Sequence, residues 1–260
     1  MIGEEIIWER KRASKIFGGA PTAKSGDEYA VNCRLSFVKD IQFSGLTLDV
    51  GCGYGAHIRE IPDSLGLEVQ RKFFAIRKSE IVNGIGESIP IRTGSCGRVF
   101  LFEVIEHVNN VKDVLREIRR VISPDGYLFL TAPNRFYPFE THGLQACGKT
   151  IENILGIGIP LLSMFPNSIR SRVERARVYS QKDLTELLQQ NGFKIVRSGY
   201  VPPNLDTLKQ SNLVQAIRSV LQTVSKRVPF KQMGISCLIV AIPTAHLRPY
   251  PEESCPCRFC

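Results

Sequence analysis

One short run, LDVGCGYG at residues 48–55, constrains this chain more than any other feature. An apolar segment passes directly into three glycines at alternate positions, and a stretch with helical character follows at 56–61. Glycine lets the backbone turn sharply and approach a ligand that a side chain would block. The run therefore predicts a buried strand, then a cofactor-binding loop, then a helix that offers free N–H groups.

Short apolar runs alternate with amphipathic stretches along the chain from residue 46 onward. This alternation is typical of βαβ units around a mostly parallel sheet, and it predicts an α/β fold. A turn is expected at 123–126, where Ser, Pro, Asp and Gly follow one another. Strands are expected at 46–50, 67–69, 80–83, 98–102, 127–132, 193–200 and 234–242, and helices at 56–61, 71–78, 111–122, 181–191 and 213–224.

With 260 residues the chain is long enough for one large α/β domain, whereas two domains would be crowded. We expect a helical or irregular N-terminal segment at 1–45, the α/β domain at 46–242 and a flexible tail at 243–260. The alternation breaks at 133–178, which is too long for an ordinary connection and predicts a lid-like insertion. Within it, an apolar stretch at 154–165 precedes four arginines, Arg170, Arg172, Arg175 and Arg177.

The charge balance of 34 Lys+Arg against 25 Asp+Glu gives a net charge of +9, which favours phosphate groups, anionic lipid or nucleic acid as partners. The first residues carry charges where a secretion signal needs an apolar core, so we expect a cytoplasmic protein. The longest uncharged stretch, 154–169, is shorter than the ~20 residues that span a bilayer, although it could lie on a membrane surface. No metal site is predicted, because the clustered Cys255, Cys257 and Cys260 lack partners at zinc-site spacing.

Three motifs occur in a fixed order: LDVGCGYG, FEVIEHV at 102–108 and ISPDGYLFLTAPN at 122–134. In these motifs the chain resembles the class I S-adenosylmethionine-dependent methyltransferases of the ubiquinone/menaquinone-biosynthesis type, the methyltransferase type 11 family. The resemblance covers 46–134 and, more weakly, the last two strands. It implies a Rossmann-like doubly wound sheet, mostly parallel with an antiparallel last strand and with helices on both faces. The implied cofactor is S-adenosyl-L-methionine.

The resemblance also implies roles for residues of the first motif. Asp49 and the backbone of Gly51, Gly53 and Gly55 would hold the methionine end of the cofactor. Glu68, at the end of the second strand, would accept hydrogen bonds from the ribose hydroxyls, a role that suits a carboxylate.

The adenine end of the expected site departs from the family pattern. Family members often read Gly-Asp-Ala-x-x-Leu-Pro after the third strand, whereas this chain reads GIGESIP at 84–90, with Ile85 in place of the adenine-contacting Asp. Three interpretations follow: the N–H groups of Gly86 and Glu87 contact the adenine, Glu87 takes over in a shifted loop, or affinity is reduced. Glu103, at the tip of the fourth strand, is expected to border the cofactor because ligands sit at the carboxyl ends of such strands.

Few catalytic side chains are expected, since the sulfonium already activates the methyl group and the enzyme chiefly aligns the reactants. His107 is a candidate general base that would take a proton from a substrate hydroxyl, or else it caps or packs at its turn. His142 is a second candidate, in the loop that leaves the fifth strand, and its alternative interpretation is a surface histidine.

The leading hypothesis is an enzyme that methylates a small or lipid-linked acceptor, with oxygen as the expected atom and with peripheral contact to an anionic membrane. A nucleic-acid or protein methyltransferase is supported by the net charge, but FEVI stands where base-methylating enzymes often carry Asn/Asp-Pro-Pro-Tyr/Phe. An NAD-dependent oxidoreductase stays open because Gly51, Gly53 and Ala56 fit the dinucleotide pattern G-x-G-x-x-G/A. A non-catalytic cofactor-binding module is the remaining alternative, and Ile85 points to it.

Overall fold

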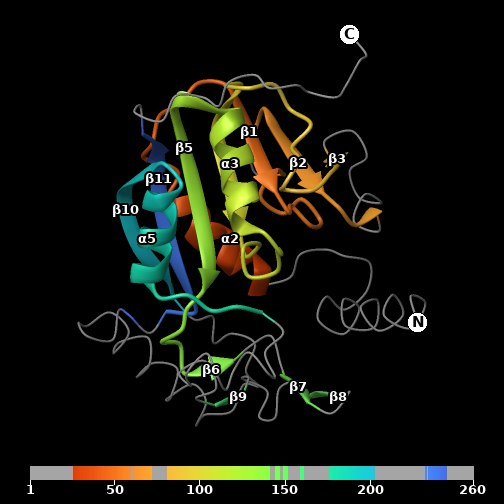
Figure 1. Ribbon diagram of the computed structural model, residues 1–260, viewed down its shortest axis with the longest axis vertical. Coiled ribbons are helices and arrows are strands. Elements are labelled where there is room, and N and C mark those ends of the chain that lie inside the picture. The colour runs from red at the N-terminus through yellow and green to blue at the C-terminus, as the bar shows by residue number, and fades with distance from the viewer. Residues whose placement is uncertain are drawn as a thin grey trace.

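A computed structural model describes residues 26–59, 61–71, 81–140, 144–146, 149–151, 159–160, 176–202, 232 and 234–244. The main element is a seven-stranded sheet in the order β10-β11-β5-β4-β1-β2-β3 (Figure 1). Its strands are β1 (Leu46–Val50), β2 (Ser64–Glu68), β3 (Ile81–Asn83), β4 (Cys96–Phe102), β5 (Ile122–Pro133), β10 (Phe193–Val201) and β11 (Ser236–Pro243).

The strands β1 to β5 pair in parallel, whereas β11 pairs antiparallel with both β5 and β10. The order reverses beside β1, since β2 and β3 lie on one side of it and β4 and β5 on the other. In such a sheet the ligand site is expected outside the carboxyl ends of the strands at this switch point. The predicted Rossmann-like sheet, mostly parallel with an antiparallel last strand, is confirmed.

Helices cover both faces of the sheet, and β4 shows how the sequence divides its side chains between them. Val99 and Leu101 face one core with helices α3 (Val111–Val121) and α5 (Gln181–Gln190). Phe100 and Phe102 alternate with them and face a second core with α2 (Gly26–Ser36). All seven residues of β4 are buried, as expected for a central parallel strand covered on both sides.

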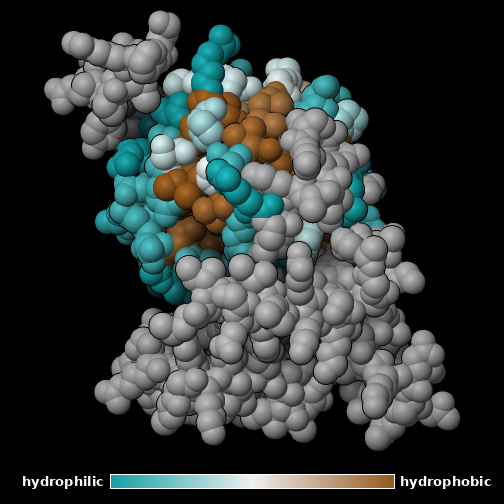
Figure 2. Space-filling view, turned by 90° about the vertical axis from the view of Figure 1, so that its right-hand side faces the viewer, coloured by the Kyte–Doolittle hydropathy of each residue, from teal (hydrophilic) through white to brown (hydrophobic). Residues whose placement is uncertain are grey.

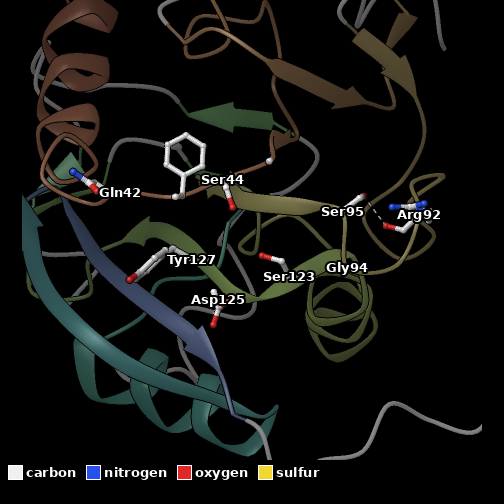
Figure 3. A pocket seen from close by; sticks show the side chains of 10 residues that line it. Gln42, Ser44, Arg92, Gly94, Ser95, Ser123, Asp125 and Tyr127 are labelled. Carbon is white, nitrogen blue, oxygen red and sulfur yellow. Dashed lines mark hydrogen bonds between the residues drawn. The ribbon is translucent and has the colours of Figure 1, made fainter.

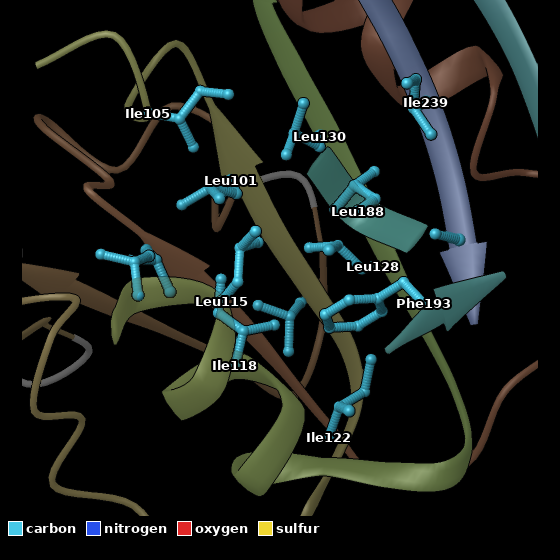
Figure 4. Close-up of a cluster of buried hydrophobic side chains, with 14 of the residues drawn as sticks. Leu101, Ile105, Leu115, Ile118, Ile122, Leu128, Leu130, Leu188, Phe193 and Ile239 are labelled. Atoms are coloured by element: carbon cyan, nitrogen blue, oxygen red, sulfur yellow. The ribbon is translucent and has the colours of Figure 1, made fainter. Parts of the chain in front are cut away.

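The core under α3 and α5 is built from interlocking aliphatic side chains, which point toward one another from helix and sheet (Figure 4). Leu115 and Ile118 from α3, Leu188 from α5 and Leu101 from β4 are each 0% exposed. This core fixes the position of β4, whose carboxyl end carries the FEVIEHV motif.

The two helices over this core begin where their sequences predict. The Asn110 side chain caps α3 by accepting from the N–H of Asp113. Ser180 caps α5 in a reciprocal capping box, in which Ser180 and Asp183 each accept the other's backbone N–H. The predicted starts at 111 and 181 are therefore confirmed.

The helix predicted at 56–61 is wrong. Consecutive turns occupy 53–59 instead, tightened by a hydrogen bond from the Arg59 N–H to the Gly55 carbonyl. The chain must reach β2 within a few residues, and the Ser64 hydroxyl lies within hydrogen-bonding distance of the carbonyls of both Ile58 and Ile61. Asp63, with a φ of 51°, completes the reversal, so no length remains for a helix.

The turn predicted at 123–126 takes the form of a bulge within β5. Ile122 pairs with Cys96 of β4, and the next pair is Tyr127 with Arg98, so four residues of β5 project between two consecutive pairs. The remaining predicted strands are confirmed with small shifts of their ends.

Several predictions fall wholly or largely outside the described residues: the helices at 71–78 and 213–224, the apolar stretch 154–165, His142 and the cysteine tail. Within the predicted insertion, four short strands form two antiparallel pairs: β6 (Phe139–Glu140) with β9 (Ile159–Pro160), and β7 (Leu144–Ala146) with β8 (Lys149–Ile151). In the described part of the chain, no helix is both long and apolar enough to cross a bilayer.

Candidate active site

The glycine loop after β1 adopts a backbone conformation that only glycine takes without strain. Gly51, Gly53 and Gly55 have φ angles of 71°, 52° and 71°. The N–H groups of Gly51 and Cys52 donate to the Leu67 carbonyl at 2.7 and 3.2 Å, which ties the loop to β2. The loop is therefore held open at the carboxyl edge of the sheet, at the switch point beside β1.

The three glycines differ in what surrounds them. A Cβ added at Gly51 would lie 2.6 Å from Val104 Cγ2, and one at Gly55 would lie 3.0 Å from the Ile58 side chain. At Gly53, no described atom outside its immediate neighbours lies within 4 Å of such a Cβ. Gly51 therefore packs against the tip of β4, while Gly53 leaves open space where a ligand can approach the backbone.

Glu68 lies beside this open position. Its side chain accepts the Gly53 N–H at Oε2 and the Gln70 N–H at Oε1, both at 2.9 Å, and the residue is 6% exposed. A carboxylate oxygen has two lone-pair directions, so each oxygen can accept a further hydrogen bond from a ligand hydroxyl. The structure thus brings the predicted ribose acid and the predicted glycine loop into direct contact.

Apolar side chains border Glu68 on the β3 side. Val69 and Ile85 are 56% and 47% exposed, and Asn83 Nδ2 donates to the carbonyls of Glu68 and Val69, which holds the ends of β2 and β3 together. Figure 2, which looks onto this side of the molecule, shows brown apolar surface among the described residues. Exposed aliphatic groups next to a carboxylate suit a ligand with a planar base joined to a ribose.

The loop at 84–90, in which this chain differs from the family's adenine-binding pattern, forms a tight turn. Ile85 and Ser88 form an antiparallel bridge, in which the Ser88 N–H donates to the Ile85 carbonyl at 3.1 Å. A Cβ on Gly86 would lie 3.3 Å from the side chain of Val114, so Gly86 packs against α3. Glu87 is half-buried in the same turn. Their contact with adenine stays a prediction.

Asp49 lies beneath the glycine loop and is 1% exposed. Its Oδ2 atom is 3.2 Å from Nδ1 of His57, whose ring packs on Phe102 with 4.8 Å between centroids. His57 is itself buried, and its Nε2 has no hydrogen-bond partner among the described residues. His57 could not be predicted from the sequence, because only the folded turn at 53–59 brings it back to Asp49.

Glu103 stands at the tip of β4 with a φ of 55°, which costs a non-glycine residue about 1–3 kcal/mol. Its N–H donates to the Thr131 carbonyl at 3.1 Å, and its Oε1 lies 3.4 Å from Nη2 of Arg34 on α2. The strained backbone is thus fixed by β5 and by an ion pair across the edge of the sheet.

Glu106 lies three residues beyond Glu103 and is 3% exposed. Neither of its carboxyl oxygens has a hydrogen-bond partner within the described ranges. Burial, and then the negative charge of Glu103, raise its pKa from an ordinary 4.5 to about 9. His107, the predicted base, has a side chain that is 52% exposed, and its Nε2 lies 3.8 Å from Glu106 Oε1.

The two ends of the predicted insertion meet at the end of β5. The Tyr179 N–H donates to the Pro133 carbonyl at 2.9 Å, and the Arg135 N–H donates to the Tyr179 carbonyl at 3.0 Å. Asn134, which is 2% exposed, donates from Nδ2 to the carbonyls of Gln232 and Gly234 at 2.7 Å each. These bonds form a closed neck through which the insertion leaves the sheet and returns to it.

Hydrogen bonds from Arg177 and Tyr179 attach this neck to the FEVIEHV segment. The backbone N–H of Arg177 donates to the Glu106 carbonyl at 3.3 Å, its Nη1 donates to the Val108 carbonyl at 3.2 Å, and the Tyr179 hydroxyl reaches the Ile105 carbonyl at 3.4 Å. The insertion is therefore attached to the same edge of the sheet as the glycine loop, Glu103 and Glu106.

A separate hollow of about 670 Å³ lies at the opposite edge, where β1, β4 and β5 begin (Figure 3). Beside it, the buried Arg98 guanidinium stacks on Phe43 at 3.4 Å from the ring centroid and donates to the Thr47 hydroxyl. Burial lowers the pKa of Arg98 to about 10. Because this hollow lies at the amino ends of the strands, it is distinct from the glycine loop. Its lining is Gln42, Phe43, Ser44, Gly45, Arg92, Gly94, Ser95, Ser123, Asp125 and Tyr127.

The groups at the carboxyl edge fit a nucleoside cofactor with a cationic amino-acid end. Gly53 opens the backbone to it, Glu68 offers a carboxylate for ribose hydroxyls, and buried carboxyl oxygens of Glu103 and Glu106 lack hydrogen-bond partners among the described residues. Positive charge on a ligand would be stabilised beside these acids.

Comparison with known proteins supports this interpretation. Residues 48–130 match the model of a family described as a methyltransferase domain. An uncharacterised protein of Methanocaldococcus jannaschii, MJ1252, is 24% identical over 223 residues, which cover 79% of this chain and 88% of that protein.

Two solved structures share the fold. The first is an S-adenosylmethionine-dependent methyltransferase of Thermotoga maritima, a possible histamine N-methyltransferase, with a TM-score of 0.57 and 15% identity over 93% of this chain and 98% of that one. The second is an S-adenosylmethionine-dependent methyltransferase of Archaeoglobus fulgidus, with a TM-score of 0.54 and 15% identity over 88% of this chain and 97% of that one.

Proposed function

We propose that this chain, which carries a class I S-adenosylmethionine-dependent methyltransferase domain, transfers the methyl group to an oxygen atom of a small or lipid-linked acceptor. The observation that carries the proposal is the closed neck at Asn134 and Tyr179, which attaches the insertion beside the tip of β4. We expect the insertion to cover an acceptor at the reaction site, because both of its ends are attached at this edge of the sheet. An acceptor enclosed in this way is a small molecule or the head of a lipid.

In the proposed mechanism the residues of the chain chiefly bind and align. The cofactor supplies a methyl group already activated by its sulfonium. The backbone at Gly53 admits the cofactor, Glu68 holds its ribose, and Glu103 borders it at the tip of β4. Glu103 is held by Arg34 and by the Thr131 carbonyl, so this edge of the site is already ordered before the reaction. Ordering it therefore adds little to the activation free energy.

His107 is a candidate base that would take the proton from the acceptor hydroxyl. Its half-exposed ring lies at the edge of the site and beside Glu106, and imidazole titrates near neutral pH. Asp49 lies beneath the loop, where it pairs with His57, and its role at the methionine end of the cofactor stays a prediction. His142 stays a second candidate.

A lipid-linked acceptor would bring this protein to the surface of an anionic membrane. The apolar stretch 154–165 and the arginines that follow it support this proposal from the sequence, and Arg177 is exposed at the neck. Replacing Arg170, Arg172, Arg175 and Arg177 together with Gln should weaken binding to anionic liposomes by about 1 kcal/mol per charge. Affinity for S-adenosylhomocysteine should not change. If the unmodified protein does not bind liposomes, membrane contact is excluded and the acceptor is a water-soluble molecule.

The acceptor is tested by transfer of a labelled methyl group from the cofactor to cell extracts divided into lipid, small-molecule, protein and nucleic-acid fractions. We expect label in the lipid or small-molecule fraction, bound to oxygen in the purified product. Label found only in protein or nucleic acid would contradict the proposal and favour the macromolecular alternative.

A further inference from the structure

The charges at the carboxyl edge of the sheet do not balance. Four carboxyl groups gather there, and among the described residues one guanidinium, that of Arg34, forms an ion pair with one of them at 3.4 Å. His57 pairs with a second carboxyl group and can carry a further charge only when protonated. The four acids are Asp49, Glu68, Glu103 and Glu106.

Glu106 is the acid with the least compensation. Asp49 is paired with His57, Glu68 accepts two backbone N–H groups, and Glu103 is paired with Arg34. The Glu106 side chain is 0% exposed, and neither of its oxygens accepts a hydrogen bond from a described residue. A carboxylate that is buried without partners is strongly disfavoured, so the group keeps its proton instead.

Glu106 lies in a segment that packs against the proposed cofactor loop. The side chain of Val104 lies against Gly51 of the glycine loop. Glu103 comes directly before Val104 in the chain, and Glu106 lies two residues after it, in the turn at 105–107. A ligand in the loop would therefore meet the segment that carries both acids. S-adenosylmethionine has a net single positive charge at neutral pH, because its sulfonium and ammonium outnumber its carboxylate, whereas S-adenosylhomocysteine is neutral overall.

We propose that the protonation state of Glu106 depends on the charge of the bound ligand. Glu106 is protonated in the free protein, ionises when the cationic cofactor binds, and takes up a proton again when the neutral product remains. The charged groups around it in the described ranges are consistent with this exchange. The charge of Glu103 favours the protonated form, whereas the Glu106 backbone and the charge of Arg34 favour the ionised form. His107 Nε2 lies 3.8 Å from Glu106 Oε1, and Arg177 donates to the backbone carbonyls of Glu106 and Val108.

The exchange also gives the reaction a destination for its proton. Methylation of a hydroxyl breaks the O–H and S–C bonds and forms an O–C bond; the S–C electron pair stays on sulfur and one proton is released. Glu106, ionised before transfer, regains its affinity for a proton as the positive charge is lost. This last step rests on the proposed O-methylation, whereas the exchange on cofactor binding does not.

The test is calorimetric titration at pH 8 in two buffers of different ionisation enthalpy, which gives the protons released per ligand bound. Glu106, with a pKa of about 9, is mostly protonated at this pH. A cation in the site should lower that pKa, so binding of S-adenosylmethionine should release a measurable fraction of a proton from Glu106. S-adenosylhomocysteine should release close to none, and Glu106→Gln should abolish the difference between the two ligands.

Glu117→Gln is the control, because hydrogen bonds from Arg120 and the Ile89 N–H keep the pKa of Glu117 low, so it is ionised in both states. It should release as many protons as the wild type. An infrared difference spectrum gives a second measurement: the carbonyl band of a protonated carboxylic acid should disappear when S-adenosylmethionine binds to the wild type, and should be missing in Glu106→Gln. If both ligands cause the same proton release, or if the carbonyl band does not change, the inference about Glu106 is overturned while the proposed function still stands. Failure of S-adenosylmethionine to bind would overturn the proposed function as well.

Discussion

Replacing Gly53 with Ala separates the role of the glycine loop in cofactor binding from its role in folding. The φ of 52° costs alanine about 1–2 kcal/mol, and the added methyl group meets no described atom within 4 Å outside its neighbours. The folded protein should therefore survive with a melting temperature lowered by about 2–8 °C. The methyl group would occupy the open space at the loop, so affinity for S-adenosylhomocysteine should fall by at least about tenfold, or 1.4 kcal/mol.

Gly94 provides a matched control. Its φ is 68°, a Cβ there would also meet no described atom within 4 Å, and it lines the hollow at the opposite edge of the sheet. Gly94→Ala should lower the melting temperature as Gly53→Ala does, while cofactor affinity stays at the wild-type value. Both variants are measured by thermal unfolding and by calorimetric titration with the nucleoside. Wild-type affinity in Gly53→Ala, or an equal loss in Gly94→Ala, would refute the assignment of the loop.

Three further substitutions test the acids of the site. Glu68→Ala should weaken binding of S-adenosylhomocysteine by roughly 1.5–3 kcal/mol through lost ribose hydrogen bonds, and an unchanged dissociation constant would show that another group holds the ribose. His57→Phe leaves Asp49 buried without its partner and should cost roughly 1–3 kcal/mol of unfolding free energy in urea titrations, so a neutral effect would dismiss the pair. Glu106 binds its proton up to pH about 9 in the folded state but only to about 4.5 when unfolded, so folding stability should fall as pH rises between these values. Glu106→Gln removes this loss, so its free energy of unfolding, measured by urea titration, should gain on that of the wild type by up to ~4 kcal/mol between pH 5 and pH 8. Parallel pH profiles would show that Glu106 is ionised in the folded state.

Most of the sheet could be predicted because its strands carry their own signals. The buried β4, with cores on both faces, ends in the apolar run 99–102, and Ser180 with Asp183 forms the capping box that its sequence indicates. The helix at 56–61 could not be excluded from local pattern, because the competing demand is tertiary: the chain must return to β2 at Ser64.

The positions of candidate site residues could be predicted where backbone conformation dictates residue type, as at Gly51, Gly53 and Gly55, and where a strand end fixes a position, as at Glu68. Their binding roles stay predictions. The pairing of His57 with Asp49 depends on a turn that the sequence did not reveal. The isolation of Glu106 depends on what lies around its carboxyl group, which motif spacing does not describe.

The central claim is that the loop at 51–55 binds the S-adenosyl nucleoside and not a nicotinamide dinucleotide, although its glycines fit both patterns. The most direct measurement is a pair of calorimetric titrations of the full chain, one with S-adenosylhomocysteine and one with NAD. We expect saturable binding of S-adenosylhomocysteine at one site per chain and no heat of binding with NAD. Tight binding of NAD together with no response to S-adenosylhomocysteine would contradict it.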